Sequence, residues 1–537
     1  MVSLWGSKKG SDESHEGTGA TGTPPDGGSS EQGGQRHQER HQEPTERTRL
    51  IPAQRHDGYL DPDDPAVSPY NLWSVRATRY LSIIFLIITF LWWVLLLVSI
   101  FVSPPGMHSR GSGFFDFSYT TLTLGNLLTG ILFFSTPSKA AQLSCFILFV
   151  LVLVDMIMIL AVTQIRFEEG WVGIASVVWA AVMAAWTVLT DRLVAWGKRE
   201  EEERLTGREE SRRTLREWCS VLTAAVVLIV LIIVTVLLTA VLILRARDAS
   251  LAAPGERYYV DGDKYRVHIF CEGNITETNG KRNPTAFFEA GEKPLENGLA
   301  QFAAGALQNG TIDRYCYWDR PGFAWSDNAP SPHSAGMTAD ALSEALARAG
   351  EQGPWILVSA GIGSIYSRIF SSRHLQEVEG IFLIDPLHED LLHRVGAPGR
   401  GFVLWARGII SPLGFDRLAG ALFKGRNRED RVYGQSASQG GKYLKAKLQE
   451  SLVADSLSKN EVSSARTIQS KKTPLVVVSS GIETRKDSEW ERKQRDLTHL
   501  TKKLVAWDIV NRAPHEVWQT YEGRQTLEYR LGQLVAR

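Results

Sequence analysis

The stretch Gly353-Pro-Trp-Ile-Leu-Val-Ser-Ala-Gly-Ile-Gly-Ser364 decides the fold of the second half of this chain. Its run W-I-L-V-S is apolar enough for a buried strand, a glycine-rich turn follows at once, and a helical stretch begins at about Ser364. A strand that passes through a tight turn directly into a helix is typical of a mostly parallel sheet covered by helices. We therefore expect an α/β domain here.

Strand-like and helical stretches alternate on both sides of this turn. Y-R-V-H-I-F-C-E-G alternates like a half-buried strand, and T-A-F-F-E-A-G resembles a fully buried one. The other expected strands are R-Y-C-Y-W-D, I-F-L-I-D, P-L-V-V-V-S-S and L-V-A-W-D-I-V, and a helix is expected near Thr338–Ala349. The pattern predicts one α/β domain over residues 256–537.

The order of these motifs resembles the α/β-hydrolase superfamily over nearly all of residues 258–537. The motifs are E-A-G, W-D-R-P-G-F-A-W-S-D, the stretch quoted above, I-F-L-I-D-P and A-P-H-E-V-W. In active members a sharp turn G-x-S-x-G lifts the nucleophilic serine above the sheet. Here Ser359 stands at the first glycine, Gly361 stands at the nucleophile, and Gly363 stands at the last glycine. The expected hydroxyl is missing.

The rest of the catalytic constellation has candidates. His515 matches the general base of the superfamily, with Asp385, Glu483 or Asp487 as the acid that orients it. The resemblance places the oxyanion hole at the amides of Glu292 and Ile362. An ionised Glu292 side chain would oppose a developing oxyanion unless it turns away. Ser359 and Ser364 are the candidate replacement nucleophiles, although neither has the geometry of the turn.

Three functions follow from these residues. Loss of a triad nucleophile costs several orders of magnitude in rate, which favours a pseudoenzyme that binds or scaffolds a lipid, another ligand or a protein partner. The alternative is a membrane-bound ester or lipid hydrolase that uses a displaced serine or a water activated by His515. We interpret Asp319 and Arg320 as a structural clamp. Trp318, Phe323 and Trp325 either line a pocket or pack in the core, and we favour core packing.

The third function, transport, would depend on the first half of the chain. Residues 1–75 have few aliphatic side chains, which predicts a disordered tail, and no cleavable secretory signal is visible.

Residues 76–250 are predicted to cross a membrane about five times, with four as the alternative. The expected spans are about 80–102, 117–135, 141–163, 171–190 and 220–244, and the second is the most polar. Asp155, inside the third, fits a hydrogen bond between helices better than a proton relay.

The basic residues near these spans predict the orientation. Arg76, Arg79, Lys139 and the loop 191–218 lie on one side, which is therefore expected to be cytoplasmic or matrix-facing. With an odd number of spans, the hydrolase-like domain lies on the non-cytoplasmic side. The whole layout resembles a group of uncharacterised fungal mitochondrial integral membrane proteins, which implies a mitochondrial membrane, and the endomembrane system is the alternative.

Two further features bear on the compartment. The sequons Asn274-Ile-Thr and Asn309-Gly-Thr would be acceptors in the lumen of the endoplasmic reticulum. In the usual strand order of the superfamily, Cys271 and Cys316 fall on neighbouring strands, which leaves a disulfide and two buried thiols both open.

The composition argues against several other partners. The chain has 59 basic and 59 acidic residues, so a nucleic-acid partner is not expected. No zinc-ligand spacing, phosphate-binding loop or dinucleotide fingerprint is present, so we expect neither a metal nor a cofactor. Membrane lipids are the expected surroundings, and a lipid or an ester is the expected ligand.

Overall fold

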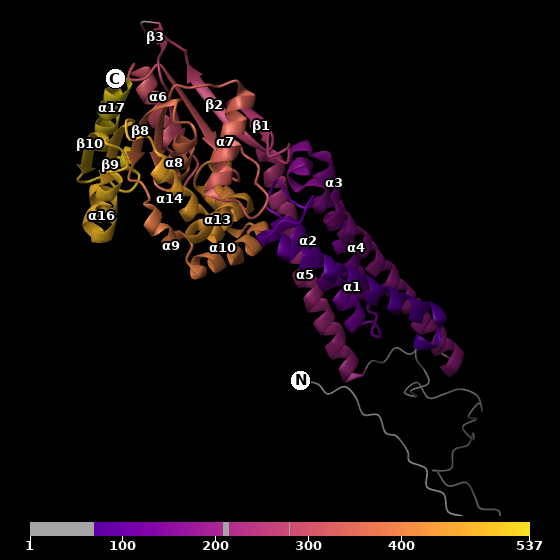
Figure 1. The fold of residues 1–537 in the computed structure, drawn as a ribbon. Helices are drawn as coiled ribbons and strands as arrows, with labels where there is room; N and C mark the ends of the chain where they lie inside the picture. The colour runs from indigo at the N-terminus through magenta and orange to yellow at the C-terminus, as the bar shows by residue number, and fades with distance from the viewer. Residues whose placement is uncertain (1–68, 208–213, 279, 537) are drawn as a thin grey trace, which may run out of the picture. The chain divides into compact units, whose positions relative to one another are not determined.

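The computed structural model describes residues 69–207, 214–278 and 280–536 (Figure 1). Nearly all of the expected disordered tail lies outside these residues. Within them, a helical bundle precedes an α/β domain. The bundle comprises η1 (Pro69–Asn71), α1 (Trp73–Phe101), α2 (Phe114–Leu132), α3 (Lys139–Ala161), α4 (Thr163–Thr206) and α5 (Leu215–Asp248).

Four of these helices, α1, α3, α4 and α5, are long and apolar enough to cross a membrane. The chain is thus a multi-pass membrane protein. Helix α2 coincides with the expected second span but falls short of that criterion, because threonines, glycines and Asn126 interrupt its apolar residues. Its polar side chains face the bundle, where Asn126 donates a hydrogen bond to Thr187 Oγ1 at 3.0 Å.

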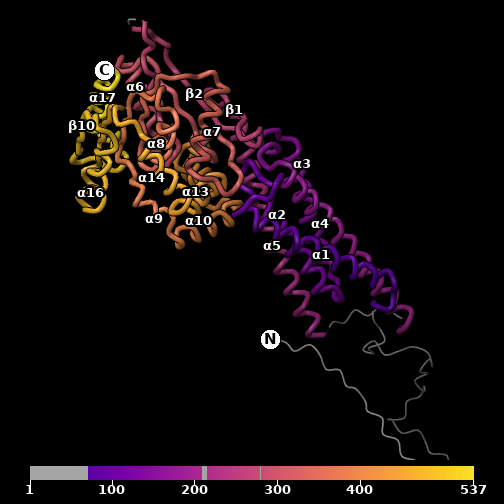
Figure 2. The backbone as a smooth tube through the Cα atoms, viewed as in Figure 1, coloured from indigo at the N-terminus to yellow at the C-terminus, as the bar shows by residue number. Residues whose placement is uncertain are grey.

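The five helices alternate in direction, and Figure 2 follows the chain through them. At one end, Val75 at the start of α1 packs with Phe134 and Val194. At the other end, Ile100 near the end of α1 packs with Phe114 at the start of α2 and with Leu448 of the α/β domain. The start of α1 and the α/β domain therefore lie at opposite ends of the bundle.

Hydrogen bonds between helices hold the bundle in register, as polar side chains commonly do in membranes. The indole nitrogen of Trp92 donates to Ser176 Oγ at 3.0 Å, and that of Trp179 donates to Thr89 Oγ1 at 2.9 Å. Tyr119 donates to the fully buried carboxylate of Asp155 at 3.1 Å, so Asp155 joins two helices.

Helix α4 is kinked at Gly170, where φ is +63°, and its long straight part follows.

The α/β domain is built on an eight-stranded sheet with the order β1-β2-β6-β5-β7-β8-β9-β10. β1 and β2, and β2 and β6, are antiparallel, and the other neighbours are parallel. This is an α/β-hydrolase-type sheet. Its strands are β1 (Glu256–Val260), β2 (Tyr265–Gly273), β5 (Thr285–Glu289), β6 (Arg314–Asp319), β7 (Trp355–Ala360), β8 (Val378–Ile384), β9 (Pro474–Ser480) and β10 (Lys503–Val510), with β3 (Glu277–Thr278) and β4 (Lys281–Arg282) forming a separate hairpin.

Helices cover both faces of the sheet. Alternate residues of β7 point to opposite faces, so Leu357 packs in one hydrophobic core and Ile356 and Val358 pack in the other. The first core includes α7 (Ala335–Ala349), α8 (Gly363–Arg373) and α14 (Lys459–Ile468), and the second includes α6 (Leu299–Gln308) and α17 (Tyr521–Val535). The remaining short elements are α15 (Gly481–Lys486), α16 (Ser488–Leu497) and η6 (Val517–Gln519).

A helical insertion between β8 and β9 makes many of the contacts with the bundle. Gly408 of α10 lies against the ring of Phe114, and Arg431 of α12 binds Asp248 at the end of α5. The insertion comprises η2 (Glu389–Leu391), α9 (Leu392–Val395), α10 (Pro398–Ile410), η3 (Ser411–Leu413), α11 (Phe415–Phe423), α12 (Arg428–Val432), η4 (Gln435–Gln439), α13 (Gly441–Val453), η5 (Ala454–Ser458) and α14.

Candidate functional site

The turn after β7 has the backbone geometry of a nucleophile elbow without the nucleophile. Gly361 has φ of +48°, a left-handed conformation that side chains rarely adopt. Gly363 starts α8 so close to the E-A-G turn that a Cβ there would clash with the carbonyl oxygen of Ala290. The two glycines permit the sharp strand-to-helix turn that the sequence predicts.

His515 and Asp385 come together beside this turn. His515 Nδ1 lies 2.6 Å from Asp385 Oδ2. The other carboxylate oxygen of Asp385 accepts hydrogen bonds from the Ser480 amide and the Trp490 indole, both at 3.0 Å. Asp385 is fully buried, and its φ of +41° directs the chain away from the end of β8. Of the three candidate acids, Asp385 is the one whose carboxylate the structure places against His515.

The side chain of Glu292 fills the space where a nucleophile would react. Its Oε2 lies 3.0 Å from His515 Nε2, and its Oε1 accepts a hydrogen bond from the Ile362 amide at 3.2 Å. A Cβ on Gly361 would meet both Glu292 oxygens, at 2.7 and 2.8 Å, and His515 Nε2 at 2.9 Å. The Glu292 carboxylate thus accepts the hydrogen bond of the Ile362 amide, which was expected to bind the oxyanion. It does not turn away from the oxyanion hole.

Charge stabilises this arrangement. Burial opposes the charged imidazolium, but the hydrogen bonds and charges of Asp385 and Glu292 outweigh it and raise the pKa of His515 to about 11. Burial also opposes the charged carboxylate of Glu292, yet His515, Lys447 and the Ile362 amide lower its pKa to about 2. At neutral pH the site is an Asp385–imidazolium–Glu292 chain, and a protonated His515 cannot act as a general base.

The two candidate serines lie outside this arrangement. Ser359 is fully buried and its Oγ accepts a hydrogen bond from Ser367 Oγ at 2.8 Å. Ser364 is also buried, and its hydroxyl donates to the carbonyl oxygens of Gly361, at 2.8 Å, and Leu387, at 3.2 Å. Glu483 pairs instead with Lys486 at 3.7 Å. None of these three side chains contacts the ring nitrogens of His515, which pair with Asp385 and Glu292.

Supporting contacts come from residues that the sequence did not single out for the site. Tyr443, on α13 of the insertion, donates a hydrogen bond to the Glu292 carbonyl oxygen at 2.5 Å. Trp490, on α16, fixes Asp385. Neither has a motif of its own, and no sequence signal marked them.

The Asp319-Arg320 segment clamps the core, as expected, but through separate partners. Arg320 binds Glu289 Oε1 at 2.9 Å and the carbonyl oxygens of Ala290 and Gly291 at 2.5 Å, which fixes the turn that carries Glu292. Asp319 binds His268 Nδ1 at 2.9 Å.

Two groups of residues in the described part of the chain have metal-ligand chemistry. Cys271 and Cys316 lie near Glu351, but they form a disulfide between β2 and β6 and therefore offer no thiolate. His268 lies near Asp319 and Glu296, but both of its ring nitrogens already have hydrogen-bond partners in Asp319 and the carbonyl of Pro254. Neither group fits a metal ion.

The two sequons lie at the surface. Asn274 is exposed in the loop after β2, and Asn309 is exposed at the end of α6, where its amide donates to Glu528 at 2.7 Å.

Comparison with known proteins gives relatives that match most or about half of the chain. A family model described as a region of unknown function (DUF2417) matches residues 44–271. An uncharacterised protein of Schizosaccharomyces pombe is 35% identical over 503 residues, which are 88% of this chain and 92% of that protein. An uncharacterised vacuolar membrane protein of Saccharomyces cerevisiae is 29% identical over 325 residues, and the match covers 52% of this chain and 50% of that protein.

Solved structures resemble the α/β domain. An α/β-hydrolase enzyme from a deep-sea metagenome library is 12% identical, with a TM-score of 0.37, over 52% of this chain and 98% of its own. An enol-lactonase from Burkholderia xenovorans is 15% identical, with a TM-score of 0.36, over 52% of this chain and 100% of its own. These likenesses concern the fold alone.

The layout of the sequence implied a location in a mitochondrial membrane. The relatives do not support this location, since one is named a vacuolar membrane protein. The match to the Schizosaccharomyces pombe protein extends over most of both chains. The chain therefore belongs to the same family as that protein.

Proposed function

We propose that the hydrolase-like domain is a pseudoenzyme that binds a ligand or partner and does not cleave esters. One observation carries the proposal: the Glu292 carboxylate occupies the space above Gly361 and bonds both His515 and the Ile362 amide. An acyl substrate needs that amide for its oxyanion, and a serine or water needs a neutral His515 as base. The ion pair occupies the Ile362 amide and keeps His515 protonated, so neither group is available for ester cleavage.

A fluorophosphonate probe tests this directly on the full-length protein in detergent. Wild-type protein should remain unlabelled. The double variant Gly361→Ser, Glu292→Ala adds the hydroxyl and clears the carboxylate, so it should gain labelling that the further change His515→Gln abolishes. Labelling of wild-type protein that disappears in Ser359→Ala or Ser364→Ala would contradict the proposal and restore the hydrolase with a displaced serine.

We further propose that the domain faces the lumen of an endomembrane compartment. The disulfide between Cys271 and Cys316 fits an oxidising space, the sequons at Asn274 and Asn309 are exposed, and a relative is named a vacuolar membrane protein. Treatment with an endoglycosidase should shift the mobility of the protein from cells. The shift should persist in Asn309→Gln or Asn274→Gln alone and vanish in the double variant; protein without glycan and with free Cys271 would contradict a lumenal domain.

A further inference from the structure

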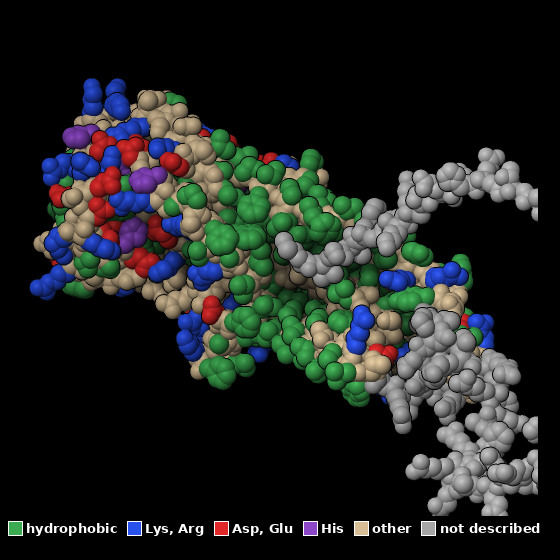
Figure 3. Space-filling model, turned by 90° about the horizontal axis from the view of Figure 1, so that it is seen from below, with side chains coloured by type: hydrophobic (Ala, Val, Ile, Leu, Met, Phe, Trp, Pro, Cys, Tyr) green, Lys and Arg blue, Asp and Glu red, His purple; other side chains and the backbone are tan. Residues whose placement is uncertain are grey.

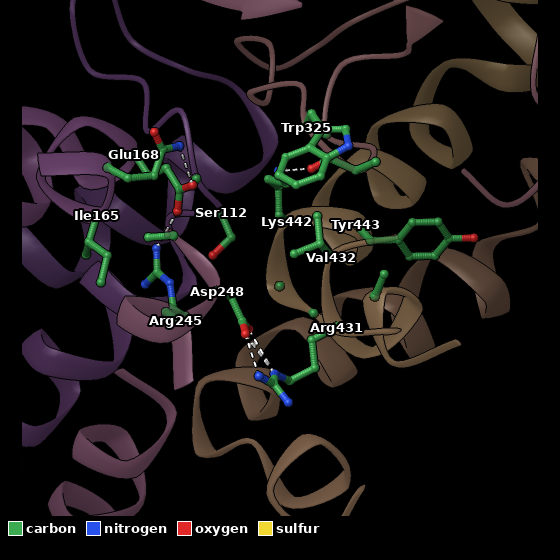
Figure 4. A pocket seen from close by; sticks show the side chains of 18 of the residues that line it. Ser112, Ile165, Glu168, Arg245, Asp248, Trp325, Arg431, Val432, Lys442 and Tyr443 are labelled. Atoms are coloured by element: carbon green, nitrogen blue, oxygen red, sulfur yellow. Dashed lines mark hydrogen bonds and ion pairs between the residues drawn. The ribbon is translucent and has the colours of Figure 1, made fainter. Parts of the chain in front are cut away.

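A cavity of about 140 Å³ lies where the helical bundle meets the α/β domain (Figure 4). Its walls come from the start of α2, the start of α4, the end of α5 and the insertion. Pockets for whole drug-sized ligands are larger, roughly 300–1,000 Å³. A water molecule takes about 30 Å³ in the liquid, so this cavity has room for a small polar group with part of its attachment.

Cations dominate the wall of this cavity. Five lining residues are basic and two are acidic. The basic residues are Arg245, Arg257, Arg417, Arg431 and Lys442, and the acidic residues are Glu168 and Asp248.

The carboxylates are already engaged by two of these cations. Arg245 binds Glu168 at 2.9 Å and Glu169, behind the wall, at 2.5 Å. Arg431 binds Asp248 through several contacts, the shortest at 2.5 Å. In Figure 4 these two pairs lie on different sides of the open space.

The other three cations have weaker compensation. Among the described residues, Arg257 donates to the neutral side chain of Gln164, at 3.3 Å, and Lys442 donates to the carbonyl oxygen of Ala324, at 2.5 Å. Arg417 reaches Asp248 only at 3.5 Å, and its buried Nε has no hydrogen-bond partner.

Asp327 and Asp319, two acidic groups beyond the wall that act on Arg257 and Lys442, have hydrogen-bonded partners of their own. Asp327 pairs with Arg266 at 2.9 Å, and Asp319 binds His268. Burial lowers the pKa of Arg257, Arg417 and Lys442, and neighbouring cations lower it further. The nearby carboxylates oppose this shift but do not cancel it. Buried positive charge without a matching anion is costly, and an anion in the cavity would relieve it.

The cavity also lies close to the expected membrane surface. Arg417 is on α11, and α10 and α11 expose large apolar side chains beside the bundle. These are Phe402, Val403, Ile410, Phe415, Leu422 and Phe423. Figure 3 shows apolar side chains extending from the bundle onto the adjoining part of the α/β domain. Such a surface suits the boundary between headgroups and acyl chains, where phosphate groups are abundant.

We propose that this cavity binds a phosphate group, either of a phospholipid headgroup or as free phosphate. The guanidinium groups of Arg257 and Arg417 and the ammonium of Lys442 supply N–H donors and positive charge, which suit the several oxygens and the negative charge of phosphate. Neither Glu292 nor His515 lines this cavity, although Tyr443 of its wall also donates to the Glu292 carbonyl oxygen. The proposal concerns binding at the cations and does not rest on the absence of catalysis at His515.

The test uses the full-length protein in a maltoside detergent, which contains no phosphate. Thermal unfolding is measured with sodium phosphate and with sodium chloride at equal ionic strength, and phospholipids that remain bound through purification are quantified by mass spectrometry. The variants Arg417→Gln and Lys442→Gln each remove one undercompensated cation. Lys424→Gln is the matched control, because it removes a charge at the exposed end of α11 outside the cavity.

Each outcome has a defined meaning. If phosphate raises Tm by about 2–5 °C in wild-type and Lys424→Gln protein, but not in either cavity variant, free phosphate is the ligand. If phosphate has no effect but wild-type and Lys424→Gln protein retain phospholipid that both cavity variants lose, the ligand is a headgroup. If neither occurs, or if both effects survive in the two cavity variants, the proposal is wrong.

Discussion

Glu292 Oε2 lies 3.0 Å from His515 Nε2, so a carboxylate of this chain stands against the nitrogen that a nucleophile would use. The contact ties the E-A-G turn after β5 to the loop after β10. Because Asp385 holds the other ring nitrogen, the imidazolium has a carboxylate on each side.

Replacement of Glu292 by Gln should lower the pKa of His515 from about 11, because one of its two anionic partners becomes neutral while the shape is kept. NMR titration of the histidine ring measures this change. Glu516→Gln is the control: Glu516 adjoins His515 in sequence but pairs with Lys293 at 2.8 Å. An unchanged His515 pKa in Glu292→Gln would show that the ion pair does not form in solution.

The ion pair should also make stability depend on pH at both ends of the range. The pKa of His515 is raised from 6.5, so its contribution is complete below about 6.5 and is lost as the pH rises toward about 11. The pKa of Glu292 is lowered from 4.5, so its contribution is present above about 4.5 and is lost as the pH falls toward about 2.

The Tm difference between wild-type protein and the double variant Glu292→Gln, His515→Gln should therefore be largest at about pH 4.5–6.5. Thermal unfolding in a series of buffers measures it. A difference that stays constant across the whole series would argue against the charged pair.

Replacement of Gly361 by Ala should destabilise the protein for two reasons. The left-handed backbone costs an L-residue about 1–2 kcal/mol, and the new Cβ would also press on Glu292 and His515. Gly310→Ala separates the two terms, because Gly310 also has a positive φ, +72°, but no atom lies within 4 Å of its added Cβ. Thermal unfolding should show a greater decrease in Tm for Gly361→Ala than for Gly310→Ala. Equal decreases would show that the contact of the new Cβ with Glu292 and His515 does not contribute.

Removal of the disulfide in Cys271→Ser, Cys316→Ser should destabilise the folded α/β domain. For a sequence separation of 45 residues, loop closure predicts a loss of about 4 kcal/mol. The control is Cys219→Ser, which changes an exposed free thiol on α5 and should leave stability unchanged. Calorimetry with and without reductant should give a lower Tm for the reduced wild-type protein and no further effect of reductant on the double variant.

The sequence predicted features that depend on neighbouring residues more completely than features that depend on distant ones. The turn at Gly361 and the helix after it are encoded in one continuous stretch, and the structure has both. The choice between Asp385 and Glu483 was beyond the sequence, because it depends on the positive φ of Asp385 and on contacts from Ser480 and Trp490.

Two other features depend on contacts between remote segments. The sequence identified the charge of Glu292 as unfavourable for an oxyanion, but it could not show that the side chain reaches His515, 223 positions later. The cationic cavity likewise combines Arg245 of α5, Arg257 of the α/β domain and Arg417 of the insertion. No periodicity or local motif links such residues, so only the folded chain brings them together.

The ion pair between Arg431 and Asp248 has a consequence for dissecting this protein. A fragment cut after α5 would contain the complete sheet, yet its Arg431 would lose Asp248 and the apolar side of α10 would lose Phe114. A guanidinium left without its carboxylate and an apolar surface left in water both favour unfolding or aggregation. We therefore expect that a cut where the sequence changes from membrane-spanning to α/β leaves an α/β fragment less stable than the same domain in the full-length protein.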